Sequence, residues 1–166
     1  MGGPSLATPE TARADTTLLA YYPFEEGTGD TTQDAAGRNG AARLAGDASF
    51  AAGKYGAALE FTGFGDWVDT GRSILDTSHS FSIACWINLP EGFDSDFRTA
   101  LSQDAGRVSG FYLRYDKPQA GCAADRLSFT RWNRDSAERP ACAHSVDRPR
   151  PGEWIHLAGI ADLEHH

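Results

Sequence analysis

Apolar residues recur at every second position through the middle of this chain. Residues 81–89 read FSIACWINL, and the odd positions carry Phe81, Ile83, Cys85, Ile87 and Leu89. Successive side chains of an extended strand point to opposite faces, so this period predicts a β-strand with one face in a core. Ala84 and Trp86 fall on the other face. We therefore predict a strand covered on both sides, with Trp86 in the core beside Phe81 and Ile83.

A second strong strand signal lies near the end of the chain. Residues 154–160 read WIHLAGI, and we predict that Trp154 and Leu157 are core residues. His156 alternates away from Leu157. A lone histidine in a strand is more often a structural hydrogen-bonding group than a ligand or a base, and we interpret His156 in that way.

Weaker runs of the same kind fill the rest of the sequence. They lie at residues 18–24, 41–44, 48–50, 57–61, 67–70, 99–102, 111–115, 127–132 and 141–146. Segments rich in Gly, Asp and Pro separate them, and no stretch of a dozen residues carries a 3.6-residue apolar period. Many short strands with regular turns predict an all-β sandwich or jelly roll of antiparallel sheets.

The net charge of the chain limits the partners that it can bind. The formal net charge is −8, so phosphate backbones and anionic membranes would repel the chain. No apolar stretch approaches the roughly 20 residues that a membrane-spanning helix needs.

Residues 1–17 are small and polar and are interpreted as a flexible linker. Residues 163–166 match the start of a Leu-Glu-polyhistidine expression tag, which leaves one domain at 18–162.

Five segments in order resemble the laminin-G-like and pentraxin-like branch of the concanavalin A-like lectin/glucanase superfamily, in its bacterial members. The opening YPFEEGTG at 22–29 and DAAGRNG at 34–40 come first. GKYGAALEFTG at 53–63 is similar to the family's G-x-x-G-x-A-L-x-F-x-G segment. SFSIACWI at 80–87 and GEWIHLAG at 152–159 match its central and late strands.

The resemblance implies a jelly-roll sandwich and a non-catalytic recognition module that binds carbohydrate or an extracellular protein. We expect the module to belong to a larger protein that is secreted or at the cell surface. A structural spacer beside a secreted hydrolase is the alternative, and a glycan hydrolase is the least favoured function. The family has further strands after the segment at 152–159. We therefore expect an incomplete sandwich, and self-association through exposed strand edges.

The acidic residues do not predict an enzyme. Glucanases of this fold carry E-x-D-x-x-E on one strand, and a retaining mechanism needs two carboxyl groups about 5–5.5 Å apart. No such run occurs, and the adjacent Glu25 and Glu26 would point to opposite faces of an extended chain. No Cys or His spacing matches a zinc site.

An odd number of cysteines, three, leaves at least one without a disulfide partner. Cys85 lies in the apolar pattern at 81–89 and is predicted to be a buried thiol. Cys122 and Cys142 flank polar, loop-like sequence. They could form a disulfide, which would indicate an oxidising compartment, or they could be free thiols.

Two groups of residues are candidates for binding. Many lectin-like sandwiches hold calcium with loop oxygens, and Asp34 and Asp66 in Gly-rich loops are the candidate ligands; solvated turn acids are the alternative. Tyr112, Arg114 and Trp132 are the candidate sugar-binding residues. Tyr112 and Arg114 share a strand face by period 2. The alternative is that these aromatic residues are core and the arginine is solvated.

Overall fold

The computed structural model describes residues 17–63, 65–104, 106–119, 122, 124–132 and 140–163. Its elements are β1 (Thr31–Thr32), β2 (Ala42–Ala45), β3 (Ser49–Ala52), β4 (Ala57–Glu60), β5 (Trp67–Asp69), β6 (Phe81–Asn88), the 3-10 turn η1 (Phe93–Ser95), β7 (Arg98–Gln103), β8 (Phe111–Asp116), β9 (Arg126–Arg131), β10 (Ala141–His144) and β11 (Trp154–Ala161). None of the described segments forms a helix long and apolar enough to cross a bilayer.

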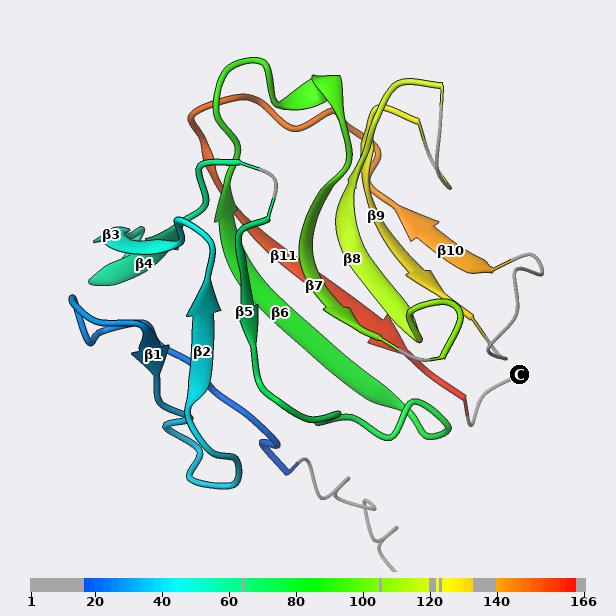
Figure 1. The fold of residues 1–166 in the computed structure, drawn as a ribbon. Helices are drawn as coiled ribbons and strands as arrows, with labels where there is room; N and C mark the ends of the chain where they lie inside the picture. Colours follow the sequence, from blue (N-terminus) through cyan, green and yellow to red (C-terminus); the bar gives the residue numbers. More distant parts are fainter. Residues whose placement is uncertain are drawn as a thin grey trace, which may run out of the picture.

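Two layers of antiparallel strands form the body of the molecule (Figure 1). One layer is the four-stranded sheet β10-β9-β8-β7, and the other is the pair β11-β6. The predicted all-β sandwich is confirmed. Two smaller sheets, β1-β2-β5 and β3-β4, come from the N-terminal half of the chain.

The core lies between the two layers. Leu113 and Phe129 of the larger sheet are buried, and Leu157 of β11 packs against both of the clusters that make up the core. The strand β6 alternates between half-buried and exposed residues along its whole length. Its inward residues Phe81 and Ile83 pack on the Phe129 cluster, so the predicted core face is confirmed.

The prediction that Trp86 is a core residue is wrong. Trp86 is 42% exposed, because it lies on the outer face of the β6–β11 pair. The ring of Tyr55 meets it edge-on at a centroid distance of 5.7 Å, but Tyr55 is itself 71% exposed. Trp154 is half-buried and belongs to neither core cluster, unlike Leu157.

The strand predicted at residues 18–24 does not form. This segment pairs with no strand among the described residues and is held instead by hydrogen bonds to Asp34 and Ala35. The Tyr21 N–H donates to Asp34 Oδ1 at 2.8 Å, and the Tyr21 carbonyl accepts from the Ala35 N–H at 2.7 Å. These hydrogen bonds satisfy the Tyr21 backbone without a neighbouring strand.

The β6 and β11 strands carry none of the sequence features that commonly protect strand edges. In the part of the chain that the structure describes, β6 and β11 form ladder pairs only with each other, in a continuous eight-residue register. Neither strand contains a proline or a Lys, Arg, Asp or Glu residue. Charges, prolines and bulges are the common devices that blunt such edges. Self-association through them stays a prediction.

Close packing of the two layers depends on Gly159 in β11. A Cβ atom at this position would lie 2.7 Å from two ring atoms of the buried Phe129. The missing side chain therefore lets β11 approach the larger sheet closely.

We predict that Gly159→Ala lowers the free energy of unfolding by about 1–3 kcal/mol, because Phe129 or the backbone must shift to admit the methyl group. Urea unfolding followed by tryptophan fluorescence measures the change. Gly40→Ala is the matched control: its Cβ would meet nothing within 4 Å and its φ is not left-handed, so it should stay within about 0.5 kcal/mol of wild type. Equal effects of the two substitutions would contradict this role.

Candidate functional site

The outer face of β8 and β9 carries polar and aromatic residues in an ordered arrangement. In β8, Phe111, Leu113 and Tyr115 point into the core, so the alternate residues Tyr112, Arg114 and Asp116 lie on the opposite face of the sheet. In β9, Ser128 lies opposite Arg114 and Thr130 lies opposite Tyr112. Trp132 follows at the end of β9. We call these six residues the β8–β9 face; Asp116, Ser128 and Thr130 are buried in it, and the other three are partly exposed.

The structure brings together the three residues predicted to bind a sugar. The rings of Tyr112 and Trp132 meet edge to face with their centroids 5.5 Å apart. The Arg114 guanidinium carbon lies 4.7 Å from the Tyr112 ring centroid and 4.3 Å from that of Phe97. Both distances are within the range of a cation–π interaction. All three predicted residues are partly buried rather than fully in the core or fully solvated.

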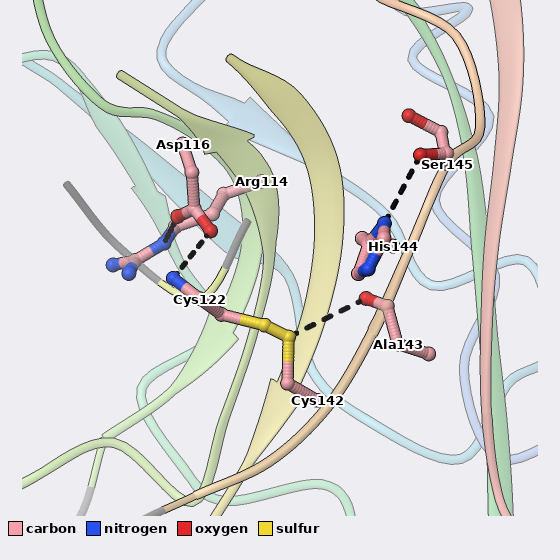
Figure 2. The surroundings of a disulfide bond; sticks show 7 residues. All are labelled: Arg114, Asp116, Cys122, Cys142, Ala143, His144 and Ser145. Atoms are coloured by element: carbon pink, nitrogen blue, oxygen red, sulfur yellow. Dashed lines mark hydrogen bonds and ion pairs between the residues drawn. A yellow bond between two sulfur atoms is a disulfide. The ribbon is translucent and has the colours of Figure 1, made fainter. Parts of the chain in front are cut away.

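A buried carboxylate fixes the direction of Arg114. Arg114 Nε donates to Asp116 Oδ1 at 2.7 Å, and the Asp116 side chain is completely buried. The Cys122 N–H donates to the other oxygen, Asp116 Oδ2, at 2.8 Å (Figure 2). Arg114 is thus held by a charge-assisted hydrogen bond on one side and by aromatic rings on its faces.

A disulfide closes the β8–β9 loop over this face. Cys122 in the loop is joined to Cys142 in β10, with their Cα atoms 6.2 Å apart. Cys142 lies opposite Thr130 of β9, so the bridge ties the loop to β10 across β9 (Figure 2). The Ser128 and Thr130 hydroxyls are buried, and neither has a hydrogen-bond partner within the described residues.

Cys85 is the cysteine left free. It lies on the core face of β6, and burial raises the pKa of its thiol to about 11. The thiolate is the reactive form of cysteine, so Cys85 should be unreactive near neutral pH.

We predict that iodoacetamide at about pH 8 leaves the native protein unmodified, because Cys85 is protonated and the other two cysteines are bonded. Mild reduction of the native protein should then expose two modifiable thiols, Cys122 and Cys142, identified by mass spectrometry. Modification of Cys85 at the rate of a free thiol, before any reduction, would contradict the assignment.

The candidate calcium ligand Asp34 anchors a loop. Its Oδ1 accepts the N–H groups of Tyr21 at 2.8 Å and Ala36 at 2.9 Å. Its Oδ2 accepts the Asn39 N–H at 2.8 Å, the Asn39 side-chain amide at 2.9 Å and the Arg38 N–H at 3.1 Å. These donors, with that of Tyr21 first, hold the pKa of Asp34 far below its usual value of 3.8.

The second candidate ligand, Asp66, has the same kind of surroundings in a different loop. Its Oδ1 accepts the Asp47 N–H at 2.8 Å. Its Oδ2 accepts the N–H groups of Thr62 at 2.7 Å and Gly63 at 3.0 Å. The Asp47 N–H is the main cause of the lowered pKa of Asp66.

Neither aspartate fits a calcium site. Calcium needs six to eight oxygen ligands, whereas N–H donors already face both oxygens of each carboxylate, and the two aspartates share no partner. Among the described residues, no group of three or more His, Cys, Asp or Glu side chains could hold a metal ion. The structure thus gives the calcium prediction no support at Asp34 and Asp66, and calcium binding elsewhere stays a prediction.

We predict that Asp34→Asn destabilises the protein at neutral pH, since an amide cannot accept from N–H donors on both sides. The folded-state pKa of Asp34 is depressed, so its contribution is complete above pH 3.8 and is lost as the pH falls below that value. The stability gap between variant and wild type should therefore narrow in acid, as measured by thermal unfolding across a pH series. Asp30→Asn, at a side chain that is 73% exposed, should show no such gap.

The sequence interpretation missed a second aromatic group. Trp86, Tyr55 and His156 lie on the outer face of the β6–β11 pair, with the rings of Trp86 and His156 5.1 Å apart. Lys54 Nζ lies 5.9 Å from the Trp86 ring centroid. One feature of the sequence could have indicated that Trp86 lies on the outer face: this residue falls out of phase with the apolar odd positions of residues 81–89. Tyr55 lies in a Gly-rich turn, which carries no such signal.

The comparison with known families agrees with this architecture. The sequence model of the concanavalin A-like lectin/glucanases superfamily matches residues 61–166. That range contains both layers of the sandwich and the whole β8–β9 face. The chain therefore belongs to this superfamily. Neither curated proteins nor solved structures gave a significant match to the chain.

Proposed function

We propose that this protein is a non-catalytic recognition module that binds carbohydrate on the β8–β9 face. The superfamily fits a carbohydrate- or protein-binding domain, but fold alone does not fix function. The observation that carries the proposal is the grouping of Tyr112, Trp132 and Arg114, with Arg114 oriented by Asp116.

The chemistry of a sugar suits such a group. The C–H face of a pyranose is apolar and packs on aromatic rings, while its rim of hydroxyls needs directed hydrogen-bond partners. Tyr112 and Trp132 supply rings. The planar guanidinium of Arg114 supplies N–H donors in a fixed fork. Rings and donors that are already held in place lose little conformational entropy on binding.

The disulfide supports a location outside the cytoplasm. Disulfides form and persist in oxidising environments, and Cys122–Cys142 closes a 20-residue separation beside the candidate site. We place the module in a secreted or cell-surface protein on this ground.

The acid on this face is unsuited to catalysis. Glycoside hydrolysis needs one carboxyl group to donate a proton and a second to act as nucleophile or base. Asp116 is completely buried and is bonded to Arg114 and Cys122. Its oxygens therefore face protein donors rather than a substrate, which supports binding over hydrolysis. A structural spacer is the competing function.

Screening of wild type against a glycan array tests the proposal, followed by calorimetry on the best ligand. We predict that Trp132→Ala and Tyr112→Ala each weaken binding about tenfold or more, or ~1.4 kcal/mol. Trp67→Ala is the control: this tryptophan is 55% exposed but lies on β5 in another sheet, and its loss should leave the affinity unchanged.

Two outcomes would contradict the proposed function. A protein that binds no glycan while presenting native unfolding behaviour would be a spacer or a protein-binding module. A ligand whose affinity depends on Trp67 and not on Trp132 would place the site elsewhere.

A further inference from the structure

We infer that the ligand of the β8–β9 face is an uncharged, hydroxyl-bearing sugar rather than a uronate or a sulfated glycan. This inference rests on the proposed function and adds the ligand class. It is carried by the charge balance around Arg114.

Arg114 offers donors that the protein does not use. Its Nε bonds to Asp116, and within the described residues its two terminal nitrogens have no hydrogen-bond acceptor. Figure 2 shows these two nitrogens turned away from Asp116. A guanidinium fork of this kind can bind the two oxygens of a carboxylate or two neighbouring hydroxyls. Geometry alone therefore leaves both ligand classes open.

The charge balance around Arg114 favours the neutral ligand class over the anionic one. Arg114 lies 2.7 Å from a carboxylate that is completely buried, so the pair is already neutral. A carboxylate or sulfate bound to the terminal nitrogens would lie close to Asp116, and no described residue of this face supplies an unbalanced positive charge to offset the repulsion. A neutral hydroxyl accepts the same N–H groups without that penalty.

A second cation over the Phe97 ring is balanced in the same way. Lys117 Nζ also lies over Phe97, 5.0 Å from its ring centroid. It is bonded to Asp96 Oδ1 at 3.0 Å. Arg114 and Lys117, the two cations over Phe97 within the described residues, thus each have a carboxylate partner. The formal net charge of −8 adds a long-range repulsion for anionic ligands.

The two hydroxyl residues on this face add no ligand contacts to the charge argument. Ser128 is opposite Arg114 and Thr130 is opposite Tyr112. Each residue is 1% exposed, and its hydroxyl oxygen is buried with no hydrogen-bond partner within the described residues. A ligand on the surface would not reach these oxygens, so the inference rests on the charge balance around Arg114.

The experiment compares matched ligands: neutral galactose and glucose tetramers against the corresponding uronate and sulfated tetramers. We expect wild type to bind a neutral member at least about tenfold more tightly than its anionic counterpart. Binding should change little between about 0.05 M and about 0.5 M NaCl, because no net charge is paired. A preference for the anionic members, or affinity that falls steeply with salt, would overturn the inference and leave the proposed function standing.

Asp116→Asn provides the sharper test. The amide keeps the size of the carboxylate and leaves Arg114 with an unbalanced charge, so binding of the uronate or sulfated tetramers should rise at least about tenfold and become salt-sensitive. Asp94→Asn is the matched control: it removes one negative charge from an exposed ion pair with Arg148 and should not change the preference.

Each remaining outcome is decisive. Unchanged preference in a folded Asp116→Asn protein would contradict the charge argument. If that variant fails to fold, the preference and salt dependence of wild type still test the inference. Absence of any glycan binding by wild type would remove the proposed function and this inference together.

Discussion

Face-to-face packing of the β6–β11 pair against the four-stranded sheet is the contact on which the molecule depends. Leu157 of β11 reaches both core clusters, and Gly159 lets its strand approach the ring of Phe129. Because strands alternate, the residues that meet in this core also determine which residues face outward. Burial of Phe111, Leu113 and Tyr115 places Tyr112, Arg114 and Asp116 together on the opposite face.

That opposite face is held by a buried carboxylate and a disulfide. Asp116 links three parts of the fold: its carboxylate accepts from Arg114 on its own strand and from Cys122 in the loop, and Cys122 is bonded to Cys142 in β10. The β8–β9 loop is consequently tied to two strands by covalent and charge-assisted bonds. The Asp116 hydrogen bonds and the disulfide therefore hold both the loop and the candidate site in place.

The alternation along residues 81–89 was enough to predict the strand and its inward face, because period 2 is a local property of the chain. The sandwich class followed from the many short strands separated by turns. It could not show whether the second face of β6 is covered, which depends on strands distant in sequence, and Trp86 was misplaced for that reason. Tyr112, Arg114 and Trp132 were predictable as residues of neighbouring strands. The buried Asp116 and the N–H donors around Asp34 depend on how loops fold back, and no sequence pattern reports that.

The Arg114–Asp116 pair bears on the choice between a spacer and a binding module. A buried ion pair loses hydration that its attraction only partly restores, and apolar residues of similar volume often give equal or greater stability. Stability alone is therefore a weak reason for a domain to place an arginine on a fully buried aspartate between Phe97 and Tyr112. What the pair does provide is direction: the guanidinium is fixed with its two terminal nitrogens turned away from Asp116, and no described residue accepts from them. A spacer has no use for such donors, whereas a recognition surface loses less entropy on binding because of them.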